Sequence, residues 1–273
     1  MDNHICKTCQ NNFEGSFCNS CGEKVIHHDD RKLKYFLGEL INAITFADNK
    51  LWRTLKNIVV SPGLYSLNFV EGKRKSYMKP ISLFFLANLI YFLIPSFNTF
   101  NSNLYYQMNG FWHSDIVSNM INQEVASGNI ELKSYSEIYN QKTEELSKLL
   151  LIIMAGLLAI FFYPIHIGSK KNLFADHLVM GIESMVFILL FCIIALANFL
   201  FLFSLIDIYI ATDSNLTLMG FLSLIYFFIR VEHTFYGFRG FRMILNSFLC
   251  LVSVALAVSA YRAILFFVTF WSI

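Results

Sequence analysis

Four cysteines near the amino terminus form the arrangement whose chemistry is easiest to identify. Two residues separate Cys6 from Cys9, eight follow, and Cys18 and Cys21 repeat the pair directly before Gly22. Four thiolates at such spacing are the ligand set of a closed tetrahedral zinc site, and glycine permits the tight turn of a knuckle. The pattern predicts a structural Zn²⁺ in a zinc ribbon at residues 1–28. A redox dithiol pair or two disulfides would fit poorly in a reducing cytosol.

A second group of ionisable side chains surrounds two turns between apolar stretches of the chain. Its members are His166, Asp176, His177, Glu183, Glu232 and His233. Ionisable groups near membrane depth are costly and often functional, so turns that approach each other could bind a divalent metal or relay protons. The spacing matches no established ligand motif. The favoured interpretation is plainer: these residues pair with cations such as Lys170, Lys171 and Arg230 and close one end of a helix bundle.

The apolar stretches that must position these groups are long enough to cross a membrane. Residues 185–206 form a run of 22 without a formal charge, which as a helix would measure roughly 33 Å against a hydrocarbon thickness of about 30 Å. A helix on a soluble protein would be apolar along one stripe only. Charged residues make up 15% of the chain, against roughly 25% in soluble domains, which indicates several spans.

The sequence predicts an all-α polytopic membrane protein with about five transmembrane helices in residues 80–273. The expected spans are residues 80–97, 149–167, 185–206, 214–229 and 243–261. A polar, acidic segment at 98–148 separates the first two and is expected outside the cytoplasm. The fourth span offers only 16 residues before Arg230, and the tail after Arg262 could continue the last span or lie on the membrane.

Residues 29–79 predict basic amphipathic helices at the membrane surface. Apolar side chains recur with the period of a helix at 33–44 and again at 51–59, until Pro62 and Gly63 end the second helix. Such helices either lie in the lipid headgroup layer or pack on the cytosolic face of the bundle, and the sequence leaves both open. The side chains expected to contact headgroups are Lys32, Lys34, Arg53, Lys56, Lys73, Arg74 and Lys75.

Lysines and arginines sort to one side of this arrangement. Seventeen of the 21 lie before the first span or in the turns after the second and fourth spans, while four lie in the 98–148 segment or at Arg262. Because basic loops are retained in the cytoplasm, the amino terminus and its cysteines are expected there. Five spans would then place the carboxyl terminus outside.

Several segments together resemble a known family. They are the paired cysteines with their eight-residue gap, the EGKRKSYMKP segment before the first span, and FADHLVMGIESMVF at the start of the third. The combination is similar to the bacterial membrane family catalogued as domain of unknown function 3667, which more often has Glu-His where this chain has Asp176 and His177. The resemblance implies a bacterial inner-membrane protein with a cytosolic zinc ribbon, and it implies no activity.

Function is constrained mainly by the motifs that the sequence does not contain. It has no phosphate-binding loop, nucleophile elbow or glycine-rich dinucleotide turn, so an enzyme is not favoured. The leading interpretation is an interaction or scaffold protein whose zinc ribbon binds a protein partner and whose basic helices contact membrane lipids. The alternative is a transporter or channel for a small solute, lipid or ion that uses the cytosolic histidine and carboxylate turns. Nucleic acid is not favoured, because the lysines flank lipid-seeking faces; a homo-oligomer and a membrane-embedded metalloenzyme stay open.

Overall fold

The structure is a computed structural model that describes residues 3–22, 49–93, 100–128, 130–171, 173–195, 198 and 213–273. It forms two compact units, Met1–Lys50 and Leu51–Ile273. The first predicted amphipathic helix, with Lys32 and Lys34, lies outside the described residues, and so does most of the carboxyl-terminal half of the third predicted span.

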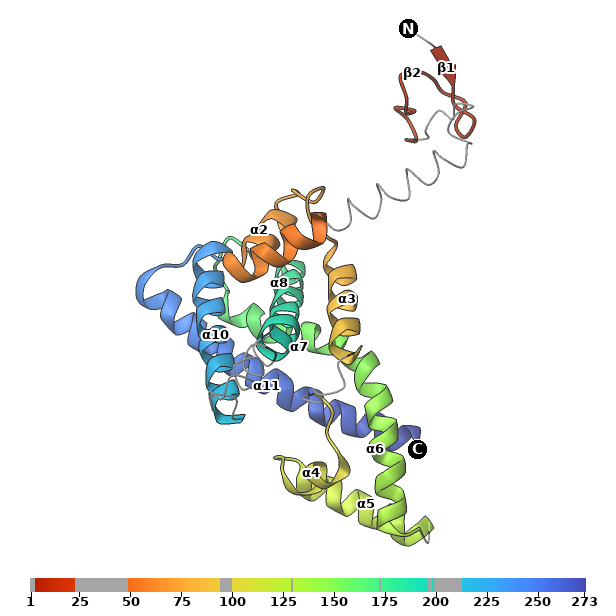
Figure 1. The fold of residues 1–273 in the computed structure, drawn as a ribbon, viewed down its shortest axis with the longest axis vertical. Coiled ribbons are helices and arrows are strands. Elements are labelled where there is room, and N and C mark those ends of the chain that lie inside the picture. Colours follow the sequence, from red (N-terminus) through yellow and green to blue (C-terminus); the bar gives the residue numbers. More distant parts are fainter. Residues whose placement is uncertain are drawn as a thin grey trace. The chain divides into compact units, whose positions relative to one another are not determined.

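The amino-terminal unit is a small β-hairpin that gathers the cysteines. Strand β1 (Asn3–Ile5) pairs antiparallel with β2 (Asn12–Glu14), in a register that sets His4 opposite Phe13 (Figure 1). Phe13 is buried together with Cys6 and Cys18. Gly22 has a φ of 78°, and its N–H donates to the carbonyl of Cys18, so the turn behind the second cysteine pair requires the left-handed conformation that glycine adopts most readily.

The second unit is helical in all its described elements of regular structure. Residues 49–60 form a helix that precedes the labelled ones. The labelled elements are α2 (Leu64–Val70), α3 (Pro80–Leu93), α4 (Leu104–Asn109), α5 (Ser114–Gly128), α6 (Leu132–Leu150), α7 (Ile152–Ile165), α8 (Phe174–Val186), the π-helical segment η2 (Phe187–Ala195), α10 (Asp213–Thr234) and α11 (Gly240–Ser272).

Two helices are long and apolar enough to cross a membrane. They are the continuous helix Phe174–Ala195, made of α8 and η2, and α11 with its 33 residues. Helices α6 and α7 would count as a third span if they are taken together, although they meet at an angle of 58°. Five spans are therefore not supported by the described residues. Helix α3 has 14 residues there, about 21 Å, and α10 carries Arg230 and Glu232 close to its end.

The tail after Arg262 continues the last helix, because α11 runs without a break to Ser272. Its last turns pack against α4, α5 and α6, where Phe266 is buried among residues such as Val117, Ile121 and Tyr139. The side-chain amide of Gln107 on α4 donates to the backbone carbonyl of Arg262 at 3.2 Å. The predicted polar segment 98–148 is thus largely helical, and it forms a cap on the carboxyl-terminal half of α11.

The centre of the unit is the packing of α7, α8 and α11 (Figure 1). Helices α7 and α8 approach so closely that a Cβ added to Gly181 would lie 2.5 Å from the carbonyl oxygen of Ala155. Such close contact through small residues is typical of helix pairs in membranes, where packing replaces the hydrophobic driving force. Any larger side chain at this position would force the two helices apart.

The helix 49–60 and α2 lie across the amino-terminal end of α8 (Figure 1). Ile58 is fully buried, and a Cβ on Gly63 would be 3.2 Å from Phe235, so this segment packs on the helix bundle. The described part of the segment therefore makes the bundle contacts of one of the two arrangements left open by the sequence. Trp52, on the predicted apolar face, instead remains 71% exposed.

Candidate functional site

The four amino-terminal cysteines converge on one point. The sulfur of Cys6 lies 3.4 Å from that of Cys21, and the sulfur of Cys9 lies 3.5 Å from that of Cys18. All four sulfur atoms lie within 4.8 Å of one another, and none of the cysteines is in a disulfide. Tetrahedral ligands about 2.3 Å from a zinc ion would be roughly 3.8 Å apart. The four cysteines could therefore hold a metal ion with little rearrangement.

The backbone of the hairpin prepares two of these thiols for metal binding. The N–H of Cys9 is the main cause that lowers the pKa of Cys6, and the N–H of Cys21 is the main cause that lowers the pKa of Cys18 to about 6. Hydrogen bonds to a sulfur favour its charged form, and the thiolate is the form that binds metals. The turns of the knuckles thus supply both the spacing and the protonation state that a metal requires.

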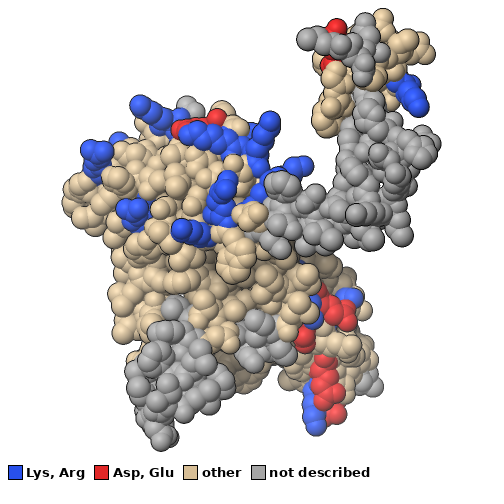
Figure 2. Space-filling view, turned by 45° about the horizontal axis from the view of Figure 1, so that its top comes forward, with Lys and Arg blue, Asp and Glu red and all other residues tan. Residues whose placement is uncertain are grey.

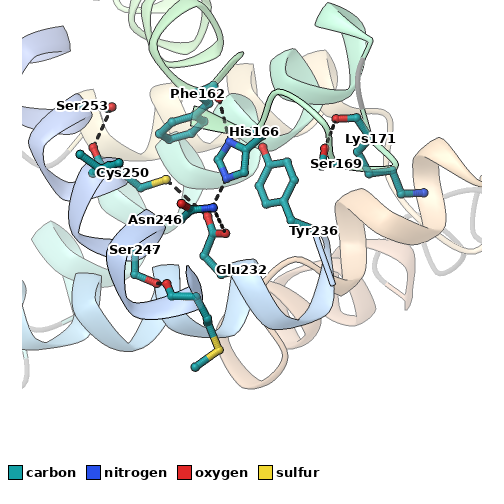
Figure 3. A network of polar contacts seen from close by, with 12 residues as sticks. Phe162, His166, Ser169, Lys171, Glu232, Tyr236, Asn246, Ser247, Cys250 and Ser253 are labelled. Atoms are coloured by element: carbon teal, nitrogen blue, oxygen red, sulfur yellow. Dashed lines mark hydrogen bonds and ion pairs between the residues drawn. The ribbon is translucent and has the colours of Figure 1, made fainter. Parts of the chain in front are cut away.

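The second cluster lies inside the helix bundle, where α7, α10 and α11 meet (Figure 3). His166 follows the last turn of α7, and its Nε2 lies 2.7 Å from Oε1 of Glu232 on α10. From α11, the thiol of Cys250 lies 3.6 Å from the same oxygen, and the amide of Asn246 donates to Oε2 at 3.3 Å. His166 and Glu232 are fully buried and Cys250 is 1% exposed. These groups form one polar network surrounded by apolar packing.

Tyr236 and His177 extend this network toward α8. The ring of Tyr236 stacks on that of His166, with centroids 3.5 Å apart, and its hydroxyl is hydrogen-bonded to Nδ1 of His177 at 2.9 Å. Burial, together with the nearby groups of Cys250 and Glu232, raises the pKa of Tyr236 well above its ordinary value, so the phenol stays neutral. Nε2 of His177 is buried and has no hydrogen-bond partner among the described residues.

Glu183 belongs to a different cluster from the other predicted site residues. Its carboxylate accepts hydrogen bonds from the backbone N–H groups of Gly63 and Ser66, at 2.8 and 3.0 Å, and from the hydroxyl of Ser66. These N–H groups belong to the start of α2, where a helix has no internal acceptors and carries positive partial charge. Glu183 therefore fastens α2 to α8, and it does not take part in the histidine cluster.

The structure brings together half of the predicted polar site. His166 contacts Glu232 directly, Tyr236 links His166 to His177, and Asp176 is buried close enough to influence the phenol of Tyr236. His233 points to the exposed side of α10. Of the cations expected to neutralise the site, Lys171 pairs with Glu71 instead, at 3.5 Å.

Sequence reasoning missed two members of the cluster. Cys250, which lies in an apolar run, and Tyr236 are both absent from the residues predicted for the site. Cys250 and Asn246 are four residues apart on one helix, so they share a face. From that face Asn246 makes an interhelical hydrogen bond to Glu232. The spacing was the available signal for Cys250, whereas Tyr236 lies in a loop and had none.

The cationic residues expected at lipid headgroups gather on one end of the second unit (Figure 2). The described and exposed ones in the prediction are Arg53, Lys56, Lys73, Arg74 and Lys75. Lys170 and Arg239, from the turns before α8 and α11, are exposed as well. Acidic side chains gather instead over α5 and α6 (Figure 2). The second unit thus has a basic end and an acidic end.

Residues 48–92 match the model of a family described as protein of unknown function (DUF3667). The matched segment includes the helix 49–60, α2, the basic turn after α2, and nearly all of α3. No curated protein and no solved structure matches the chain. The match therefore agrees with the family resemblance seen in the sequence and brings no activity with it.

Proposed function

We propose that the protein is a scaffold of the bacterial inner membrane whose zinc ribbon binds a protein partner in the cytoplasm. The observation that carries the proposal is the cluster of four cysteine sulfurs, because four protein ligands close a tetrahedral site and leave no position for a substrate. The same hairpin exposes Ile5 by 71% and Phe17 by 59%. Apolar side chains presented on a small, metal-held unit are suited to binding another protein.

The charge distribution supports a cytoplasmic location for the ribbon. Helix α11 starts beside Arg239 and Arg242 at the basic end of the second unit and finishes against α4, α5 and α6, where acidic residues gather. Basic segments remain on the cytoplasmic side of bacterial membranes. An odd number of crossings, such as the five predicted from the sequence, would place the amino terminus inside and the carboxyl terminus outside.

The basic end would also contact lipid. Arg53, Lys56 and the 73–75 cluster are exposed there, and the exposed Trp52 lies on the same helix. Tryptophan is enriched at membrane interfaces, and each lysine or arginine near an anionic surface contributes about 1 kcal/mol of attraction.

The test compares the parent chain with the double variant Cys18→Ser, Cys21→Ser, and uses Cys192→Ser as a control that removes a thiol outside the cluster. A photo-crosslinking amino acid at position 17 reports partner binding in intact membranes. The double variant should lose its zinc and its crosslinked product, yet insert in the membrane as the parent does. If both variants and the parent form the same crosslinked product, the ribbon is not the docking module.

Transport of a small solute, lipid or ion is the second candidate, and the observation that favours it is the fully buried pair of His166 and Glu232 within the helices. Asn198, which would line a shared polar path with them, is exposed and donates to Ile194 of its own segment. Flux into vesicles that contain the purified chain tests this candidate. Glu232→Ala should change the flux, and equal flux with and without the substitution excludes a role for this pair.

A further inference from the structure

The contact between His166 and Glu232 requires a cation. Nδ1 of His166 lies 2.7 Å from the backbone carbonyl of Phe162, which can only accept, so Nδ1 carries a hydrogen. In the neutral ring Nε2 then presents a lone pair, and it faces Oε1 of Glu232 at 2.7 Å. Two lone pairs at that distance repel each other unless a proton or a metal ion lies between them.

A third ligand reaches the same point from another helix. The sulfur of Cys250 lies 3.6 Å from Oε1 of Glu232, and the ligand atoms of all three residues lie within 4.8 Å of one another. Nitrogen, oxygen and sulfur ligands of a tetrahedral zinc ion are roughly 3.3–3.8 Å apart. The sulfur is already at that separation from Oε1 of Glu232. His166 and Glu232 would have to part by about half an ångström to admit the ion.

The surroundings of the three ligands match those of a metal site. A metal-binding histidine usually donates its other N–H to a carbonyl or a carboxylate, as His166 does to Phe162. Asn246 holds the second oxygen of Glu232, and the ring of Tyr236 covers one face of the imidazole. Each ligand is therefore oriented by a neighbour that does not itself need to bind the ion.

We propose that His166, Glu232 and Cys250 bind one divalent transition-metal ion of the zinc type inside the helix bundle. Binding forms one bond from the ion to each of the three residues and releases two protons, one from the thiol of Cys250 and one shared by His166 and Glu232. The thiolate and the carboxylate then cancel the charge of the ion. A neutral site is the arrangement that a buried position tolerates best.

The ion would join three separate helices of the bundle. His166 lies at the end of α7, Glu232 on α10 and Cys250 on α11. A tetrahedral ion with three protein ligands also keeps a fourth position for water or another ligand. This site is independent of the four cysteines in the ribbon.

The experiment uses the full chain in detergent, with the four ribbon cysteines replaced by serine so that only the bundle can hold zinc. After exposure to Zn²⁺ and removal of the excess, the metal content should be one ion per chain. X-ray absorption at the zinc edge should show one sulfur at about 2.3 Å and nitrogen or oxygen at about 2.0–2.1 Å. The spectrum needs no substitution in the bundle, so a misfolded variant cannot obscure the result.

Two further variants of that protein assign the site. Adding Cys250→Ala should remove the sulfur signal and lower the metal content, whereas adding Cys192→Ser should leave both unchanged. If the chain without the ribbon cysteines holds no zinc, or holds it without a sulfur ligand, the proposal is overturned. The contact between His166 and Glu232 then contains a proton. If the parent chain holds one ion in that case, the ribbon binds zinc and the bundle does not.

Discussion

Glu183 is the side chain whose role changes most between sequence and structure. It lies on a helix that is apolar enough to span a membrane, yet its carboxylate accepts three hydrogen bonds from Gly63 and Ser66. Without it, the backbone N–H groups of Gly63 and Ser66 would be buried without an acceptor. Such groups cost about 1–3 kcal/mol each when they lose their partner.

Replacing Glu183 with glutamine should therefore destabilise the protein. The amide would turn an NH₂ group toward donors that need an acceptor, and we expect the free energy of unfolding to fall by about 2–3 kcal/mol. Thermal unfolding of the detergent-solubilised chain measures the change. Glu71→Gln is the matched control, because Glu71 makes exposed ion pairs with Lys73 and Lys171 that contribute about 0–1 kcal/mol. Equal effects of the two substitutions would refute an anchoring role for Glu183.

The thiol of Cys18 gives a prediction about pH. The folded hairpin lowers the pKa of Cys18 from 9.0 to about 6. A lowered pKa stabilises the folded state fully above the unfolded value, and the stabilisation disappears as the pH falls through the folded value. The metal-free parent should therefore show a thiolate that protonates near pH 6, detected by ultraviolet absorbance. Cys18→Ser should remove this step, and a step that survives the substitution would assign it to another cysteine.

Helix contacts in this protein depend on single small residues. Gly181 on α8 leaves room for the carbonyl of Ala155 on α7, while a Cβ on Gly156, also on α7, would meet no atom within 4 Å. The two glycines look alike in the sequence, because both lie in apolar helices. Their neighbours make one essential and the other replaceable.

Alanine substitutions at these two glycines should have opposite effects. Gly181→Ala forces α7 and α8 apart and should lower the free energy of unfolding by about 1–3 kcal/mol. Gly156→Ala enters open space in a helix, where alanine is favoured over glycine by about 1 kcal/mol at most, so it should be neutral or stabilising. Unfolding midpoints of the two variants in the same detergent measure the difference. If Gly156→Ala also lowered the free energy of unfolding, the effect at Gly181 could not be attributed to its contact with Ala155.

In the second unit, basic side chains gather at one end of the helices and acidic side chains at the other. Residues 53–79 and the turns before α8 and α11 supply the cations of one end, while Asp115, Glu137 and Glu144 lie on helices of the other. A membrane protein sorted in this way is held in one orientation by its basic end. The orientation proposed for the chain depends on this sorting.

Labelling of introduced cysteines in intact cells tests that orientation. Ser127 and Lys75 are both exposed, one on α5 and one in the basic turn after α2. A membrane-impermeant thiol reagent should label Ser127→Cys in intact cells, and it should label Lys75→Cys only after the membrane is permeabilised. The parent chain provides the background from its native cysteines. The reverse pattern would place the four-cysteine hairpin outside the cell and remove the basis of the proposed scaffold.

The sequence by itself determined the helical class, the location of two long apolar helices, the four-cysteine cluster and the charge asymmetry, whereas its count of five spans is not supported by the described residues. Each of these follows from residue type and spacing along one short stretch of chain, where physical chemistry acts between near neighbours. The π-helical segment Phe187–Ala195 and the continuation of α11 to Ser272 were beyond it, because Arg262 looked like an end to the apolar run.

Only the tertiary structure decided which ionisable groups meet. His166, Glu232 and Cys250 come from three helices and are far apart in the chain. Glu183 also lies in an apolar stretch, but its carboxylate contacts the first turn of α2 instead. A buried carboxylate must find donors or a cation, and the sequence lists many of both. Helix packing alone selects which of them lies within about 3 Å.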